Sequence, residues 1–130
     1  MPENIKQEPT AGELEILNVL WRLGSCTVRT VNDEINKTKE AGYTTTLKLM
    51  QIMFEKGLLK RNDDQRSHIY SAAVAKEETQ QAIVGNVIDT AFGGSSAQLV
   101  MQALGGKKAS KQEIDEIRKF LDDMEKKAKE

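Results

Sequence analysis

The chain has 130 residues, a formal net charge of −1 and 30% charged residues, which suits one domain with an appendage or two very small domains. Its 38% hydrophobic content is that of a globular protein and not of a disordered one. No apolar run approaches the ~20 residues that a membrane span requires, and residues 1–10 lack the apolar stretch of a secretion signal. We therefore expect a cytoplasmic protein without membrane insertion. The near-neutral total excludes a histone-like basic binder.

Three helices are expected in the first sixty residues. Residues 10–13 (TAGE) match a capping box that opens a helix to about Leu23. Thr27 is expected to cap a second helix with a narrow apolar stripe. After a polar turn at 36–42, the stretch 43–59 (YTTTLKLMQIMFEKGLL) predicts a third helix closed by a glycine. Two helices joined by a short turn are the layout of a helix-turn-helix motif.

The third helix has two distinct faces at 100° per residue. One arc is apolar and needs a core. The opposite arc carries hydroxyl, amide and lysine side chains, which can meet base edges or phosphates. The apolar arc contains Thr46, Leu49, Met50 and Met53, with Phe54 beside it, and the polar arc contains Thr44, Lys48, Gln51 and Glu55.

A hairpin is expected directly after this helix. Strand-like residues at 58–61 and 68–71 flank a polar turn at 62–67. This position predicts the wing of a winged helix-turn-helix domain, with Arg61 and Arg66 as contacts to the DNA backbone and the two aspartates of the turn facing outward. The alternative is an ordinary surface hairpin with solvated charges, which Asp63 and Asp64 favour at the tip because carboxylates repel phosphate.

The second half predicts three further helices. Glycine pairs are expected to end the helices at 77–92 and 97–104, and Ser110 opens the last helix. That helix has an apolar seam at 3-4-3 spacing, which favours a two-fold homodimer over packing of the seam onto its own chain. We expect the fold to be mainly helical with a small β wing: residues 1–74 form a DNA-binding domain and residues 75–130 a helical dimerisation domain. The expected dimerisation residues are Leu99, Val100, Ile114, Ile117, Leu121 and Met124.

The residues that usually carry catalysis or bind metals are sparse. Cys26 is the only cysteine and is interpreted as a small, partly buried filler. No Cys/His cluster has the spacing of metal ligands, and His68 has no serine or carboxylate context of a catalytic triad. The glycine pairs are better interpreted as helix ends than as phosphate loops. We expect no enzyme, no metal and no cofactor.

Several of these segments together resemble the penicillinase repressors, which are grouped with the methicillin-resistance and copper-transport repressors. The matching runs are TAGELEIL with a following LW, CTVRTV, YTT, EKGLL, HIY and AFGGSS, and they cover essentially the whole chain. The resemblance implies a winged-helix repressor that dimerises through its C-terminal helices. It also implies a palindromic double-stranded DNA operator near the promoters that the protein silences.

Carried over to this sequence, the DNA-facing positions of the family fall at Thr44, Thr45, Leu47, Lys48 and Ile52, and the helix pattern adds Gln51. Two of these positions depart from the family. Lys48 stands where a threonine is common, and Ile52 stands where an arginine is common. A lysine can bind a guanine or a phosphate, whereas an isoleucine offers only apolar contact, for example to a thymine methyl group. The operator of the better-known members is therefore not expected to transfer unchanged.

The regulation of this chain is also expected to differ from that of its relatives. The antibiotic-responsive members are cleaved at an Asn-Phe bond, and the corresponding pair here is Gln102-Ala103. This difference disfavours cleavage with the same sequence preference, and with it induction through a membrane sensor-protease that acts indirectly. The C-terminal KKAKE has no cysteine pair, so copper sensing through that motif is not expected. The alternative function is a winged-helix protein-interaction module without sequence-specific DNA binding.

Overall fold

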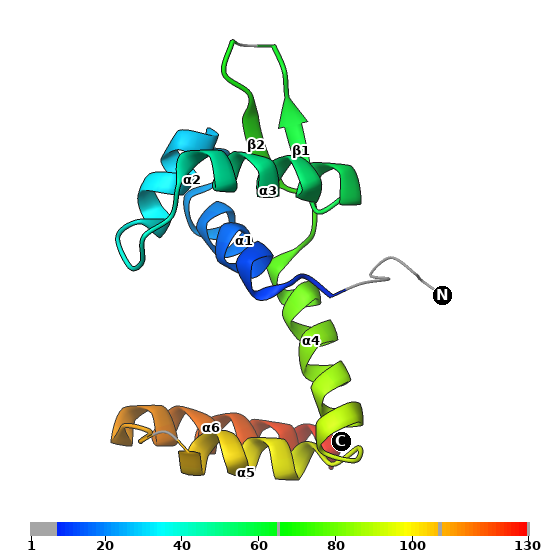
Figure 1. Cartoon of the computed structure of the whole chain (residues 1–130). Helices are drawn as coiled ribbons and strands as arrows, with labels where there is room; N and C mark the ends of the chain where they lie inside the picture. The colour runs from blue at the N-terminus through cyan, green and yellow to red at the C-terminus, as the bar shows by residue number, and fades with distance from the viewer. Residues whose placement is uncertain (1–7, 65, 107, 130) are drawn as a thin grey trace. The chain divides into compact units, whose positions relative to one another are not determined.

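The computed structural model describes residues 8–64, 66–106 and 108–129, so most of residues 1–10, in which we expect no secretion signal, lie outside it. The chain divides into two compact units, Met1–Val84 and Gly85–Glu130, and the described part is helical apart from one hairpin (Figure 1). The expected fold class is confirmed. The elements are α1 (Ala11–Leu23), α2 (Val28–Ile35), α3 (Tyr43–Lys56), β1 (Leu59–Asn62), β2 (Ile69–Ala72), α4 (Lys76–Ala91), α5 (Ser96–Gly106) and α6 (Lys111–Ala128).

Local sequence signals account for the ends of α1, α2 and α3. The Thr10 hydroxyl accepts from the Glu13 amide at 3.2 Å, and the Glu13 carboxylate accepts from the Thr10 amide at 2.9 Å, so the expected capping box is complete. Thr27 caps α2 by accepting from the Thr30 amide. Gly57 ends α3 with φ of 89°, a left-handed conformation that favours glycine.

One core holds the first unit together. It is formed by the inner faces of α1, α2 and α3 with one residue from each strand: Ile16, Leu17, Val19, Leu20, Val28, Val31, Ile35, Met50, Met53, Leu59 and Tyr70, together with Cys26. Trp21 packs on its edge, half-buried, and donates its ring N–H to the Val74 carbonyl at 3.0 Å. Burial raises the pKa of the Cys26 thiol, with the nearby Glu34 carboxylate adding to the effect, which agrees with its interpretation as a filler.

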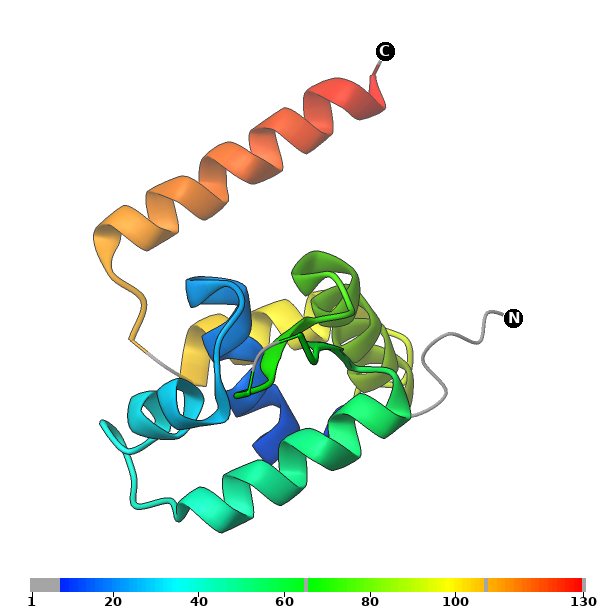
Figure 2. The ribbon, with the colours of Figure 1, turned by 90° about the horizontal axis from the view of Figure 1, so that it is seen from above.

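The hairpin follows α3 through a short link. Its antiparallel strands pair from Leu59 with Ala72 to Asn62 with Ile69, each strand one residue later than expected. A third segment joins its base, because Cys26 and Tyr70 exchange two backbone hydrogen bonds of 2.9 and 2.8 Å. This bridge ties the link before α2 to the hairpin. Figure 2 shows the turn that joins α2 to α3.

The second unit contains the C-terminal half of α4 and the helices α5 and α6. Ser95 and Ser110 accept from amides in the first turns of α5 and α6. The glycine pair Gly105-Gly106 ends α5 as expected, but the helix includes both glycines and its last residue is Gly106, not Leu104; such a difference lies within the usual variation of a helix end. Among the described residues, no helix combines the length and the hydropathy that a membrane span requires.

Candidate nucleic-acid interface

Helix α3 presents the polar face that its sequence predicts. Thr46, Met50 and Met53 are buried in the core, which leaves the opposite side of the helix in solvent. Thr44, Thr45, Lys48 and Gln51 are exposed, Ile52 is 39% exposed and Leu47 is half-buried at the edge. These six sequence-predicted residues therefore share one accessible surface, which we call the α3 face.

A buried amide fixes the N-terminal end of α3. Asn32 of α2 is 7% exposed, and in the orientation that satisfies both ends of its amide, its nitrogen donates to Thr46 Oγ1 at 2.7 Å. The same nitrogen lies 3.3 Å from the carbonyl oxygens of Ala41 and Gly42. Asn36 adds hydrogen bonds to both polar groups of the Ala41 backbone. The 36–42 turn is therefore fixed by side-chain amides, which sequence reasoning missed because Asn32 looks like a surface residue of a polar helix.

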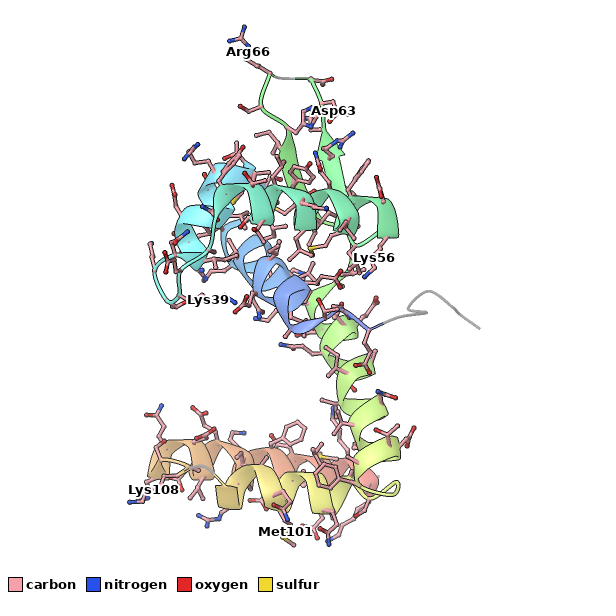
Figure 3. All side chains as sticks on the ribbon, viewed as in Figure 1. Lys39, Lys56, Asp63, Arg66, Met101 and Lys108 are labelled. Carbon is pink, nitrogen blue, oxygen red and sulfur yellow. The ribbon has the colours of Figure 1, made fainter. Side chains whose placement is uncertain are left out.

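An ion pair with a buried carboxylate fixes the other end of α3. Lys56 Nζ lies 2.7 Å from Glu13 Oε2, and Glu13 is 2% exposed. Burial raises the pKa of the Glu13 carboxyl, but hydrogen bonds from Lys56 and Thr10 outweigh it, and the net pKa is lowered. Figure 3 shows Lys56 at the end of α3. Both ends of the helix are thus attached to its neighbours by polar contacts between distant residues.

The wing carries two arginines with different surroundings. Arg61 donates to Asp63 at 2.7 Å and stacks over the Phe54 ring at 4.2 Å. Asp63, which we expected to face outward only, thus binds Arg61 although it is exposed. The nearby Tyr70 hydroxyl and the Asp63 carboxylate raise the pKa of Arg61. The Tyr70 hydroxyl itself is buried and has no hydrogen-bond partner among the described residues.

Arg66 lies at the tip of the hairpin and is exposed (Figure 3). Among the described residues it has no ion-pair partner. Within the described part of the hairpin, Arg66 is therefore a cation without a carboxylate partner, whereas Arg61 is paired with Asp63.

An open hollow of about 740 Å³ lies between the start of α2, the α3 face and the wing. We call it the α2–wing hollow. Besides Leu47, Gln51, Arg66 and His68 it contains residues that the sequence did not assign to DNA: Thr27, Val28, Arg29, Thr30, Asp33, Tyr43, Ser67 and Tyr70. Arg29 was missed because nothing in the sequence shows that it approaches α3.

The predicted dimerisation residues lie on α5 and α6, where no residue of either helix is buried. Leu99 and Ile117 are half-buried, and Val100, Ile114, Leu121 and Met124 are 40 to 57% exposed. Phe120 and Met101, which are not in the predicted set, are exposed apolar residues of the same two helices, at 63% and 71% exposed. Gln102 and Ala103 are exposed within α5.

A three-helix unit followed by a hairpin, in which the polar face of the third helix lies in solvent, is a winged helix-turn-helix domain. The sequence model of the penicillinase repressor family matches residues 9–123. The chain therefore belongs to the penicillinase repressor family, as its sequence predicted. This is a family of transcriptional repressors and not of enzymes.

Named relatives match over nearly their whole length. The chain is 24% identical to a penicillinase repressor of Staphylococcus aureus, covering 95% of this chain and 98% of that protein. It is 24% identical to the methicillin resistance regulatory protein MecI of S. aureus strain N315, covering 92% and 97%. It is 25% identical to the transcriptional regulator BlaI of Mycobacterium tuberculosis, covering 88% and 84%.

Proposed function

We propose that this chain represses transcription by binding a palindromic double-stranded DNA operator as a homodimer. The observation that carries the proposal is the exposed α3 face in a winged helix-turn-helix unit of a repressor family. Each subunit places α3 in a major groove, where Lys48 and Gln51 meet base edges and Ile52 contacts a thymine methyl group. Thr44 and Thr45 lie in the first turn of α3, which has no side-chain cap, so its amides also favour phosphate.

The wing contributes contacts to the DNA backbone. Arg66 supplies the main charge, because it is exposed and lacks an ion-pair partner among the described residues. Arg61 lies beside it and adds a weaker contact, because Asp63 already compensates much of its charge. These contacts position the protein on the duplex, whereas the α3 face distinguishes one sequence from another.

The second unit supports the homodimer. Helix α6 carries Ile114, Leu121 and Met124 on one exposed stripe, and it has no extensive contact with another helix of the described chain. An unburied a/d seam is stabilised by a matching seam, which a second copy supplies. Two subunits related by a two-fold axis then bind half-sites about one turn of DNA apart.

Selection of bound genomic fragments by the purified full-length chain tests the proposal. We expect a shared palindrome among the recovered fragments, located upstream of particular genes. Recovery of fragments without a common sequence would contradict sequence-specific repression.

A protein-interaction module is the second candidate function, and the exposed Ile52 beside Leu47 favours it. A steep dependence of DNA affinity on salt distinguishes the two, because only a DNA binder releases condensed counterions. Relief of repression by a membrane sensor-protease rests on the resemblance alone. The Gln102-Ala103 pair in place of Asn-Phe argues against the same cleavage preference.

A further inference from the structure

We propose that the α2–wing hollow is a binding site for the DNA backbone, in which Arg29 is the principal phosphate ligand together with Arg66. This inference rests on the proposed function and deepens it. It assigns to α2 a contact that neither the sequence pattern nor the positions carried over from the family include. The ligand group is a phosphate, and we assign it to the DNA backbone.

The position of Arg29 carries the argument. Its guanidinium carbon lies 4.8 Å from the centre of the Tyr43 ring, a distance at which a cation is attracted to an aromatic face. Tyr43 is the first residue of α3 and is 40% exposed. The ring therefore holds the charge of Arg29 beside the start of the α3 face. An exposed arginine without such a contact would sample many directions.

Hydroxyl and imidazole side chains line the same hollow as this cation. Thr27 and Thr30 line the hollow near the start of α2, and Ser67 and His68 line it from the wing. Arginine together with hydroxyl side chains and helix starts is the usual donor set for DNA phosphates. The volume of about 740 Å³ is far larger than one phosphate group and open to solvent, which suits a length of backbone passing through it.

A carboxylate in the hollow should weaken the binding of phosphate, and this effect can be tested. Asp33 also lines the hollow, one helical turn after Arg29 on α2. A carboxylate near bound phosphate weakens binding by repulsion. Removal of that charge should therefore strengthen DNA binding, whereas removal of the Arg29 charge should weaken it.

The test measures the affinity of the full-length chain for a fluorescein-labelled random-sequence duplex across a salt series, by fluorescence anisotropy. Non-specific DNA suffices because phosphate contacts do not depend on the operator. Arg29→Gln is compared with Arg22→Gln. Arg22 is an exposed arginine of α1 that binds Glu34 and does not line the α2–wing hollow. Trp21 fluorescence confirms that each variant is folded.

We expect Arg29→Gln to lower affinity several-fold and to reduce the slope of log affinity against log salt by about 0.9 per bound subunit. Arg22→Gln should leave the affinity and the slope unchanged, and Asp33→Asn should raise the affinity. Tyr43→Phe should bind like the wild type, whereas Tyr43→Leu should lose part of the affinity because the aromatic ring is gone. Identical behaviour of the Arg29 and Arg22 variants, with a wild type that binds DNA, would overturn the inference.

Two further outcomes distinguish this inference from the proposed function and from the binding of free phosphate. A wild type with no salt-dependent DNA binding would overturn the proposed function itself, together with this site. A titration with inorganic phosphate at constant ionic strength, followed by NMR of the Arg29 and Thr30 amides, tests the other phosphate source. Saturation at submillimolar phosphate, with unchanged DNA binding by Arg29→Gln, would assign the hollow to free phosphate and refute the DNA contact.

Discussion

The contribution of the Glu13–Lys56 ion pair to the stability of the first unit can be tested by removing the charge of Glu13. Glu13→Gln removes the charge but keeps an oxygen that can accept from the Thr10 amide, which now lies 2.9 Å from the carboxylate. The lost attraction is on the order of 4 kcal/mol, which is the energy of two unit charges about 4 Å apart at an effective dielectric constant of about 20. Desolvation of a carboxylate that is 2% exposed offsets part of this. We expect a net loss of about 2 kcal/mol in the free energy of unfolding.

The dependence of this loss on pH follows from the lowered pKa of Glu13. A carboxyl whose pKa is lower in the folded state contributes stability above its unfolded pKa, and that contribution is lost as the pH falls through the folded pKa. The ordinary value is 4.5, and the folded value lies below it. The difference between wild type and Glu13→Gln should therefore be complete at neutral pH and should shrink as the pH falls below 4.5.

Urea unfolding followed by Trp21 fluorescence provides the assay, because Trp21 is the only tryptophan and packs on the core of the first unit. Glu15→Gln is the matched control in the same helix. Glu15 binds Lys39 at 2.9 Å, but its side chain is 43% exposed, so we expect a loss below about 1 kcal/mol. Equal losses for the two variants, or a Glu13→Gln loss that persists unchanged at low pH, would refute the reasoning.

Three further changes test the interface, the dimer and α4. Lys48→Ala should weaken operator binding by roughly 1–3 kcal/mol if Lys48 reads a base, whereas a phosphate contact would lower the affinity for all DNA together and the salt slope by about one. Leu121→Asp should yield monomers in analytical ultracentrifugation and weaken operator binding, because two-site engagement is lost. Gln112→Asp, on the opposite side of α6 with the same charge change, should stay dimeric. Gly85→Ala should raise the free energy of unfolding by about 0.5–1 kcal/mol, because Gly85 lies within α4 and a Cβ there meets nothing within 4 Å.

Each of these predictions can fail in an informative way. Unchanged binding of Lys48→Ala to every sequence would remove Lys48 from the interface. A Leu121→Asp variant that stays dimeric would show that the seam is not the dimer contact. Destabilisation by Gly85→Ala would show that another segment or chain approaches Gly85 closely.

Features that have local causes could be predicted from the sequence. The Thr10 and Thr27 caps, the left-handed Gly57 and the two faces of α3 depend on neighbouring residues and on the helical period of 3.6 residues. Even so, a local signal can be ambiguous. The glycine pair after Leu104 predicts the end of α5, and the helix does end there, but at Gly106 and not at Leu104, because such a signal fixes a helix end only to within one or two residues.

Contacts between side chains that are distant in the sequence could not be predicted from it. Glu13 binds Lys56 across 43 positions of the chain, and Asn32 reaches Thr46 across 14. Such pairs depend on how whole helices pack, and the sequence contains no period or motif that specifies them. For the same reason the sequence does not predict that Arg29 lies over the Tyr43 ring, because that contact depends on the packing of α2 against α3. The sequence therefore predicts the recognition helix, and the packing around it decides which charges stand beside its exposed face.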